Sequence, residues 1–566
     1  MSTTSSPPAT GGAPHREQWS GQLGFLLAAI GSAVGLGNIW RFPGVAYTNG
    51  GGAFLIPYLV ALLTAGIPIL FLDYALGHRY RGSAPAVFRR LARGAEPLGW
   101  FQTLIAFVIT VYYAVVIAWA VSYVGFSVNL AWGDDPAGFL VGDFLKVSDP
   151  GVTFDVVPGV MIPLVIVWVV VLFIMAAGVQ KGLEKANKIF LPLLFVLFAG
   201  LVIRALTLPG SLDGLNALFT PDFAALAKPG VWIAAYSQIF FSLSIAFGIM
   251  LTYASYLPRR ANLGGTGLVA AFANSSFEIL AGIGVFATLG FMANAEQKTV
   301  AELEGITGVG LSFITFPTVI SEMPGGNIFG VLFFTSLVLA GLTSIISLLE
   351  VVTAAFQEKL GLSRIGAVLG IGGLSAVMSI MLFSTTNGLN LLDVVDKYIN
   401  EIGVVTSAIL MTLVVTYALG RLPALQRHLN GISSIPIGGW WRVLVGVITP
   451  LALIVMLATT VIALARDGYD AYPAWFTNTF GWGAVAAVAV LAVVFTLIPW
   501  RTDVDARSAH DDADEGPPVH TTIEPEPIIY DHPHGSHAAP HPDSQSHGTN
   551  DPAVRSEDHI DPRKEH

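Results

Sequence analysis

Residues 30–43 read Ile30-Gly31-Ser32-Ala33-Val34-Gly35-Leu36-Gly37-Asn38-Ile39-Trp40-Arg41-Phe42-Pro43, and they decide the fold. This run lies in an apolar segment long enough to cross a bilayer, yet it contains three glycines, an asparagine and an arginine. Backbone in lipid must satisfy its own hydrogen bonds, so these residues predict a helix that breaks where protein or water covers it. Because a broken helix offers free carbonyls to cations and free amides to anions, the break predicts a binding site.

The composition predicts an all-α polytopic membrane protein. Hydrophobic residues make up 54% of the chain and charged residues 12%, and the mean hydropathy of +0.67 excludes an ordinary soluble protein. Segments of about twenty apolar residues predict membrane-spanning helices. Twelve such helices are expected near residues 21–42, 52–76, 100–131, 157–177, 186–206, 230–256, 265–292, 327–356, 365–384, 391–419, 441–465 and 475–499.

Basic residues gather in alternate loops and predict the orientation. They are Arg79, Arg81, Arg89, Arg90, Arg93, Lys181, Lys185, Lys188, Arg259, Arg260, Lys359, Arg364, Arg421, Arg427 and Arg442. Such loops face the cytoplasm, because membrane proteins keep their positive loops inside. An even number of spans then places both termini in the cytoplasm, and we expect a multi-pass protein of the plasma (inner) membrane.

The two ends of the chain differ from the spans. Residues 1–15 lack the features of a signal peptide and predict a disordered cytoplasmic leader. Residues 501–566 contain 15 acidic and 5 basic residues and nine of the twelve histidines. This composition predicts an acidic, His-containing disordered cytoplasmic tail, with weak metal binding by His532, His534, His537 and His541 as the alternative. The chain has no cysteine, which excludes disulfides and thiolate metal sites.

A second run of small and polar residues, 238–248, interrupts the sixth predicted span. Matching interruptions in the first helix of two five-span halves predict an inverted repeat with its site between the halves, although small-residue helix packing is the alternative. Asn274, Thr343 and Ser344 in the seventh and eighth spans add oxygen atoms suited to a hard cation. Each of these three residues alone could instead serve helix packing.

Three acidic residues also fall within predicted spans, where an uncompensated charge is costly. Asp73 and Glu350 lie near span ends, which favours packing or an interfacial ion pair. Glu278 stands one helical turn after Asn274 and therefore shares its helix face.

Five motifs recur in a known family. They are Arg16-Glu17-Gln18-Trp19, the Gly35-to-Pro43 run, Asn49-Gly50-Gly51-Gly52, Thr252-Tyr253-Ala254-Ser255-Tyr256 and Ala340-Gly341-Leu342-Thr343-Ser344. Over residues 16–500 the chain resembles the neurotransmitter:sodium symporters, especially their bacterial amino-acid members. The resemblance implies a leucine-transporter-like fold, which is a 5+5 inverted repeat with discontinuous helices 1 and 6. Helices 1–5 would cover about residues 21–206, helices 6–10 about 230–419 and helices 11–12 about 441–499.

The resemblance further implies two bound sodium ions and no organic cofactor. One sodium would contact the Ala33 carbonyl, Asn38, Ser242, Asn274 and the substrate carboxylate. The other would contact the carbonyls of Gly31, Val34 and Ala340 and the hydroxyls of Thr343 and Ser344.

For the substrate, the resemblance implies a carboxylate held by the Leu36 and Gly37 amides and the Tyr113 hydroxyl. The ammonium would lie against the carbonyls of Ala33, Phe241 and Ser242 and against Ser244. The side-chain pocket would be formed by Ile109, Tyr113, Phe241, Phe247, Ser344 and Leu348. Monoamine members carry Asp where this chain has Gly35, so an α-amino acid is favoured. Ala246 stands where relatives often have Gly, which favours aliphatic substrates and leaves aromatic ones open.

Gates follow from the same resemblance. Arg41 and Asp396 would form the outer pair, and Arg16 and Glu358 the inner pair near Trp19 and Tyr256. Residues 310–317 resemble an outer lid. Gly182 and Pro192 resemble the positions where the fifth helix unwinds for inner release, or they mark a helix start and a kink.

Chloride dependence is also addressed by the resemblance. Tyr58, Gln238 and Ser242 match the anion site of chloride-dependent members, but Glu278 stands where those members have Ser. A fixed carboxylate supplies the missing negative charge, so we expect uptake without chloride. A protonatable Glu278 would also allow outward proton movement during the return step.

Taken together, these features predict a sodium-coupled symporter that imports neutral α-amino acids by alternating access, as a monomer or homodimer with no nucleic-acid partner. The alternative is an amino-acid sensor or scaffold of the same fold that binds without transporting. A channel fits the paired gates less well. The spans contain no nucleophile and base pair and no catalytic metal set, so an enzyme is not predicted.

Overall fold

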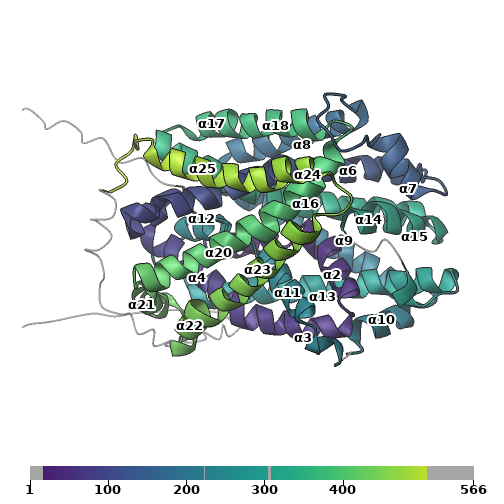
Figure 1. Cartoon of the computed structure of the whole chain (residues 1–566), viewed down its shortest axis with the longest axis horizontal. Helices are drawn as coiled ribbons and strands as arrows, with labels where there is room; N and C mark the ends of the chain where they lie inside the picture. The colour runs from purple at the N-terminus through teal and green to yellow at the C-terminus, as the bar shows by residue number, and fades with distance from the viewer. Residues whose placement is uncertain (1–16, 222, 304–307, 506–566) are drawn as a thin grey trace, which may run out of the picture. The chain divides into compact units, whose positions relative to one another are not determined.

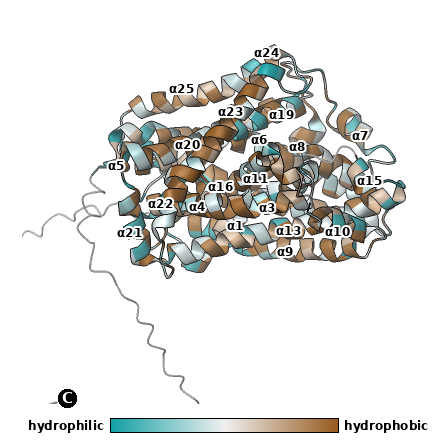
Figure 2. Ribbon diagram, turned by 60° about the horizontal axis from the view of Figure 1, so that its bottom comes forward, coloured by the Kyte–Doolittle hydropathy of each residue, from teal (hydrophilic) through white to brown (hydrophobic). Residues whose placement is uncertain are grey.

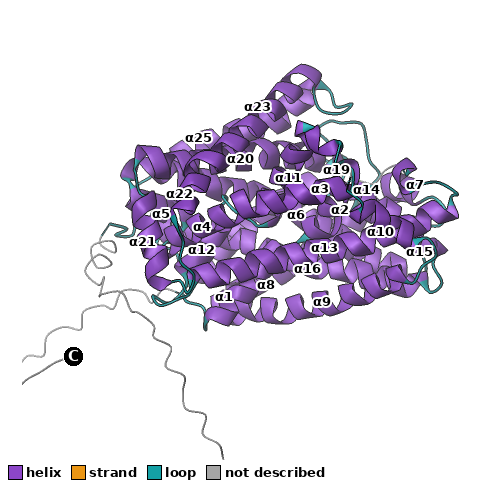
Figure 3. Cartoon of the chain, turned by 90° about the horizontal axis from the view of Figure 1, so that it is seen from below, coloured by secondary structure: helices purple, strands orange, loops and turns teal. Residues whose placement is uncertain are grey.

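A computed structural model describes residues 17–221, 223–303 and 308–505. These residues are helical, and within them the only β pairing is an isolated bridge between Val156 and Thr385. Figure 3 shows the helices and the loops that join them.

Ten helical segments of the described residues are long and apolar enough to cross a membrane, which confirms helices at ten of the predicted spans. They are Gly52–Tyr80, Arg93–Ser127, Pro158–Ala176, Val179–Leu206, Leu263–Ala295, Gly326–Leu360, Arg364–Phe383, Gly388–Ala418, Gly439–Asp467 and Ala474–Leu497. The α-helices within them are α3 (Gly52–Ala61), α4 (Ile67–Tyr80), α6 (Glu96–Ser127), α8 (Pro158–Ala176), α9 (Lys185–Leu206), α13 (Leu263–Ala295), α16 (Gly326–Leu360), α17 (Arg364–Ala367), α18 (Gly373–Phe383), α19 (Gly388–Tyr398), α20 (Val405–Leu413), α22 (Gly439–Val443), α23 (Thr449–Asp467), α24 (Ala474–Phe476) and α25 (Gly483–Leu497).

The first predicted span is broken where the sequence predicts a break. Helix α1 (Gln22–Ala33) ends before Val34, and a π-helical turn, Gly37–Arg41, leads into α2 (Phe42–Thr48). The two halves are bent by 49° and together are long enough to count as an eleventh span.

The sixth predicted span is divided more deeply, into α11 (Pro229–Ser242) and α12 (Ile249–Ser255). The residues between them leave the helical conformation, with positive φ angles of 53° at Ser244, 66° at Ala246 and 87° at Gly248. Neither half is long enough to cross a membrane alone. The described residues therefore contain ten or eleven spans by length, and the sixth expected span is represented by two short helices that do not count as a span by length.

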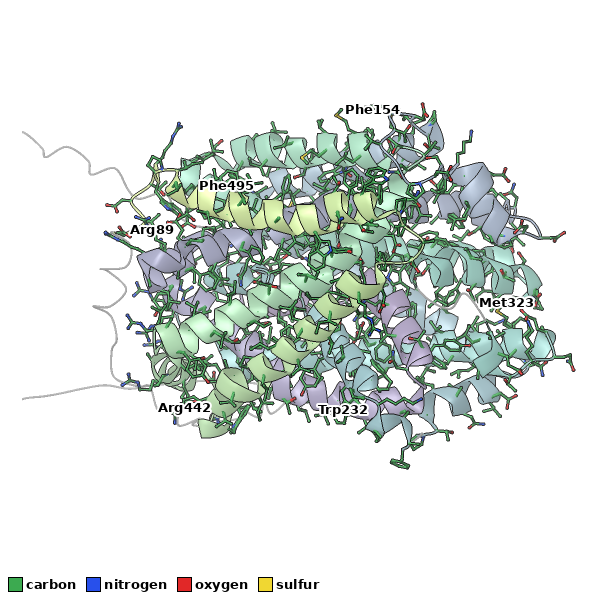
Figure 4. The ribbon with its side chains drawn as sticks, in the orientation of Figure 1. Arg89, Phe154, Trp232, Met323, Arg442 and Phe495 are labelled. Carbon is green, nitrogen blue, oxygen red and sulfur yellow. The ribbon has the colours of Figure 1, made fainter. Side chains whose placement is uncertain are left out.

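Shorter helices lie at the two ends of the bundle (Figure 1). One end carries α5 (Ala84–Leu91) and α21 (Leu422–Ile432), and the other carries α7 (Pro136–Gly138), α10 (Ser211–Phe219), α14 (Gly308–Gly310) and α15 (Phe316–Glu322). Arg89 and Arg442 lie at the first end and Met323 at the second (Figure 4). The basic loops meet there, because Arg79 contacts the Ala424 carbonyl at 3.4 Å and Arg93 pairs with Asp505 at 3.0 Å.

The packing separates a buried centre from an apolar outer surface. Helices α6 and α16 run along each other in the centre, and most residues of both are buried. Helices α23 and α25 are strongly apolar (Figure 2) and expose large side chains such as Leu451 and Leu497. Exposed apolar surface of this extent on long helices is typical of contact with lipid.

Candidate functional site

The two helix breaks face each other through one backbone carbonyl. The Ser32 carbonyl accepts a hydrogen bond of 3.2 Å from the Ser244 hydroxyl and one of 3.3 Å from the Ser344 hydroxyl. Ser32 belongs to the last turn of α1, Ser244 to the break after α11, and Ser344 to α16. Because the break releases carbonyls from helical bonding, three elements distant in sequence converge on one point.

A series of hydrogen-bonded polar side chains connects the first break to α13. Asn38 Nδ2 donates to Asn274 Oδ1 at 2.8 Å, and Asn274 Nδ2 donates to the Ser242 hydroxyl at 3.1 Å. Asn38 Oδ1 in turn accepts the Gly35 amide at 3.1 Å. All three side chains are buried. The side chains expected at the first sodium ion are therefore neighbours, linked by hydrogen bonds from amide nitrogens to oxygen atoms.

Gly35 and Gly37 lie at the first break, and because they have no side chain, large neighbouring side chains can pack against them. A Cβ added to Gly35 would lie 2.5 Å from the Ser344 hydroxyl and 3.1 Å from the Tyr113 hydroxyl, and one added to Gly37 would overlap the Phe241 ring. The Leu36 amide donates to the Tyr113 hydroxyl at 3.2 Å. The Leu36 amide thus points at the hydroxyl that is expected to bind a carboxylate together with it.

The residues expected at the second sodium ion lie where α1 meets α16. Thr343 Oγ1 donates to the Ala340 carbonyl at 2.9 Å, and a Cβ built on Gly31 would be 3.6 Å from Thr343 Cβ. Val34, the first residue after α1, leaves helical geometry with ψ of 87°. In the described residues no group of three or more His, Cys, Asp or Glu could hold a metal ion, so any cation here would depend on carbonyl, amide and hydroxyl oxygens.

The remaining pocket residues are apolar and buried. Ile109 stands one turn before Tyr113 on α6, and Leu348 stands one turn after Ser344 on α16. Phe247 lies in the break between α11 and α12 and is also buried.

Glu278 is held as a fully buried carboxylate. The Tyr58 hydroxyl donates to one of its oxygens, and Gln238 Nε2 donates to the other at 2.6 Å. Glu278, which is expected to replace a chloride ion, is therefore in direct contact with Tyr58 and Gln238, two other residues of that expected site.

The outer pair is not closed. Among the described residues, no ion pair within 4.0 Å joins Arg41 and Asp396. The Arg41 guanidinium lies 4.4 Å from the Phe241 ring centre, and Asp396 accepts from Asn400 at 2.8 Å. A cavity of about 350 Å³ borders Arg41 and is lined by Ser237. Phe313, in the expected lid, packs on Trp40 with ring centres 6.2 Å apart.

The inner residues are closely packed. Trp19 Nε1 donates to the Tyr253 carbonyl at 2.9 Å, and the Trp19 amide donates to the Tyr256 carbonyl at 3.2 Å. Glu358 accepts the Ser83 amide at 2.8 Å and pairs with Arg90 at 3.6 Å. Arg16, the expected partner of Glu358, lies outside the described residues.

Another ion pair at this end involves Glu350. Arg364 pairs with Glu350 at 2.7 Å, and Glu350 also accepts the Tyr256 hydroxyl at 2.7 Å. Packing or an interfacial ion pair was expected for Glu350, and the structure shows it fully buried and paired with Arg364. Glu17 lies 4.0 Å from Arg364, and burial raises the pKa of Glu17 although Arg364 opposes that shift. An acid inside one span and an arginine opening the next could have identified this pair from sequence.

Asp73, for which packing or an interfacial ion pair was expected, holds the backbone of the second break. It is fully buried in α4, and it accepts the Ala246 amide at 3.0 Å while Ser407 donates to the Ala246 carbonyl at 2.6 Å. Asp73 therefore anchors the second break, and it forms no ion pair with the other residues that the structure describes. The positive φ of Ala246 explains why glycine suits this position.

Gly182 and Pro192 were expected where the fifth helix unwinds or where a helix starts and kinks. A Cβ on Gly182 would overlap the Ile174 carbonyl, and Val179–Glu184 is π-helical, while Pro192 lies inside α9.

Residues 501–505, expected in the tail, contact the bundle, since Thr502 donates to the Glu358 carbonyl at 2.7 Å. The leader and the tail histidines lie outside the described residues.

A family model described as the sodium:neurotransmitter symporter family matches residues 16–139 and 133–502. The chain belongs to this family. It is 41% identical over 493 residues to an uncharacterized sodium-dependent transporter of Methanocaldococcus jannaschii, covering 85% of this chain and 97% of that protein. It is 28% identical over 517 residues to a sodium-dependent dopamine transporter of Caenorhabditis elegans, covering 81% of this chain and 82% of that protein.

Membership in the sodium:neurotransmitter symporter family means that this multi-pass membrane protein is a sodium-dependent transporter of a small molecule. Members of the family are transporters rather than enzymes.

Proposed function

We propose that this symporter imports neutral, aliphatic α-amino acids with sodium and without chloride. The observation that carries this proposal is the arrangement around Gly35. The Leu36 amide donates to the Tyr113 hydroxyl, and the hydroxyls of Ser344 and Tyr113 lie where a side chain on Gly35 would be. An incoming carboxylate would accept charge-assisted hydrogen bonds from the amide and hydroxyl donors there, whereas an amine without a carboxylate would offer them no such acceptor.

The ammonium of the substrate would lie near the carbonyls of Ala33, Phe241 and Ser242. Ile109, Phe247 and Leu348 would then surround its side chain with apolar surface. Burying an extra charge in such a pocket is costly, so acidic and basic amino acids would be excluded.

Two sodium ions would provide the driving force, one at Asn38, Ser242 and Asn274 and one at Thr343 and Ser344. Moving both across ~100 mV and a roughly tenfold gradient releases about 7 kcal/mol, enough for ~10⁵-fold accumulation of a zwitterion. The substrate carboxylate would complete the first site, which links binding of ion and substrate directly.

Glu278 would take the place of chloride. Tyr58 and Gln238 both donate to Glu278, which supports a negative charge close to Asn274 while sodium is bound. If Glu278 is protonated after sodium release, a proton would travel outward during the return step.

Alternating access would operate on a twelve-span, 5+5 inverted repeat in the plasma membrane, with both termini cytoplasmic. The separation of Arg41 from Asp396 and the packing of Trp19 on Tyr256 favour a state that is open outward and closed inward. Binding of ions and substrate would close the outer side, and sodium release would open the inner side.

Sodium-dependent uptake into proteoliposomes, screened against all twenty amino acids, tests the proposal. Accumulation of aliphatic amino acids in chloride-free buffer is expected. If no amino acid accumulates under an imposed sodium gradient, the protein is not an amino-acid transporter. A chain truncated after Asp505 distinguishes a transporter from the alternative, an amino-acid sensor of the same fold. A transporter retains uptake after this truncation, whereas a receptor that signals through its tail loses its output.

A further inference from the structure

Asn187 lies on α9 between Gly182 and Pro192, and its side chain is fully buried. Its Nδ2 donates to the Leu183 carbonyl, one turn earlier, at 2.9 Å. Because a carbonyl only accepts, the amide nitrogen must face Leu183, and this fixes which way the side-chain amide is turned. Among the described residues, the Oδ1 atom has no hydrogen-bond partner.

This unpaired oxygen is directed at α1. A Cβ built on Gly31 would overlap Asn187 Oδ1, and the same Cβ would lie 3.6 Å from Thr343 Cβ. The oxygen therefore occupies the space that Gly31 leaves open, where α1, α9 and α16 pack on one another. Gly31 and Thr343 both belong to the second sodium site of the proposed function.

A buried amide oxygen without a partner requires a reason. Leaving it unpaired costs about 1–3 kcal/mol, and such groups in native proteins are explained by strain, water or an ion. Amide and carbonyl oxygens are the ligands that hard cations take. The other atoms expected around the second sodium ion are three carbonyls and two hydroxyls, so Asn187 Oδ1 is chemically of the same kind.

We propose that Asn187 Oδ1 is a further ligand of the second sodium ion, contributed by α9. This inference rests on the second sodium site of the proposed function. The ion then joins three helices instead of two, because α9 is added to α1 and α16.

The position of Asn187 gives this ligand a consequence for release. It stands between Gly182 and Pro192, and the start of α9 is already held to the chain before α1, since Glu184 accepts the Ser20 amide at 2.9 Å. A bound sodium ion would hold this part of α9 against α1 and α16. Departure of the ion would free it, which couples sodium release to opening at the fifth helix.

Two substitutions separate sodium ligation from the bond to Leu183. Asn187→Leu removes the oxygen and the donor, whereas Asn187→Asp keeps an oxygen, replaces the donor with a second oxygen and adds a negative charge. The measurement is ²²Na⁺ binding to the purified full-length protein at pH 8, with choline replacing sodium. We expect Asn187→Leu to weaken sodium binding about tenfold, which corresponds to about 1.4 kcal/mol, and Asn187→Asp to retain or tighten it.

Thermal unfolding gives a second readout. Without sodium, Asn187→Leu should melt at or above the temperature of the unsubstituted protein, because it removes an unpaired polar group. With sodium, its gain in melting temperature should be smaller. If the Leu variant does not fold, Asn187→Ala removes the oxygen without adding volume and should behave in the same way.

Thiol labelling tests the link to α9. The chain has no cysteine, so Ala186→Cys provides a single label beside Asn187. Sodium should slow modification of this cysteine when Asn187 is present and have little effect when Asn187→Leu is added.

Equal loss of sodium affinity in the Leu and Asp variants would overturn the proposal in favour of a structural role for the bond to Leu183. Unchanged affinity in Asn187→Leu would also overturn it. If the unsubstituted protein itself shows no sodium binding, the second sodium site fails and the inference fails with it, so the two failures are distinguishable.

Discussion

Gln238 donates a 2.6 Å hydrogen bond to Glu278, so a helix that precedes the second break is tied to a buried carboxylate on α13. Asn274, one turn before Glu278, bonds to Asn38 after the first break. Helix α13 thus connects both breaks and places a carboxylate beside the residues expected to bind sodium.

Replacing Glu278 tests whether its charge substitutes for chloride. Glu278→Ser should abolish sodium-dependent uptake in chloride-free buffer and restore it when chloride is added, because the anion can then occupy the space beside Tyr58 and Gln238. Glu278→Gln is the matched control, since it removes the charge but fills the space, and chloride should not restore its activity. Chloride-free uptake by Glu278→Ser at the unsubstituted rate would contradict the assignment.

Asn38 should be required for sodium binding at the first site. Asn38→Ala removes the partner of Asn274 and leaves the Gly35 amide without its acceptor. We expect a loss of sodium affinity of tenfold or more, equivalent to about 1.4 kcal/mol, in ²²Na⁺ binding. The same substitution at Asn430 on α21, whose contacts lie far from the breaks, should leave affinity unchanged.

The pair between Glu350 and Arg364 should stabilise the protein through mutual neutralisation. Arg364→Gln leaves a buried carboxylate unpaired and should destabilise the protein by about 3 kcal/mol or more. Adding Glu350→Gln should recover part of the loss, since neither charge is then buried alone. A double-mutant cycle of unfolding free energies in detergent measures this, and strictly additive losses would argue against the pair.

We predict that His428 makes the folding stability of the protein sensitive to acid. It lies on α21, at the end of the bundle that carries the basic loops. Its Nε2 lies 3.0 Å from His78 Nδ1. Burial, then Arg79 and Arg81, lower the pKa of His428 from 6.5 to about 4. Between those pH values the unfolded chain binds a proton that the folded protein does not, so stability falls as the pH falls through this window.

His428→Gln should remove most of that dependence, which amounts to about 3 kcal/mol for a shift of this size. Unfolding measured between pH 7 and pH 4 checks it. A pH profile identical to that of the unsubstituted protein would mean that His428 does not titrate differently on folding.

Much of the fold was predictable because its signals are local. The lengths of apolar segments predicted helices at ten spans, and the glycines of residues 31–37 predicted the break after α1. The extent of the second break was harder to predict, since Ser244 and Ala246 adopt positive φ angles although they are not glycines. Asp73 and Ser407 hold Ala246 there, and no local pattern reveals partners so distant in sequence.

By itself, the sequence determined a polytopic helical protein, the two interrupted helices and the oxygen-bearing residues near them, because hydrophobic length and backbone preference act over a few residues. Only the tertiary structure decided that Ser244 and Ser344 share the Ser32 carbonyl, that Arg364 neutralises Glu350, and that Asn187 faces Gly31. These contacts join residues on different helices. They exist because packing brings buried polar atoms together where water cannot satisfy them.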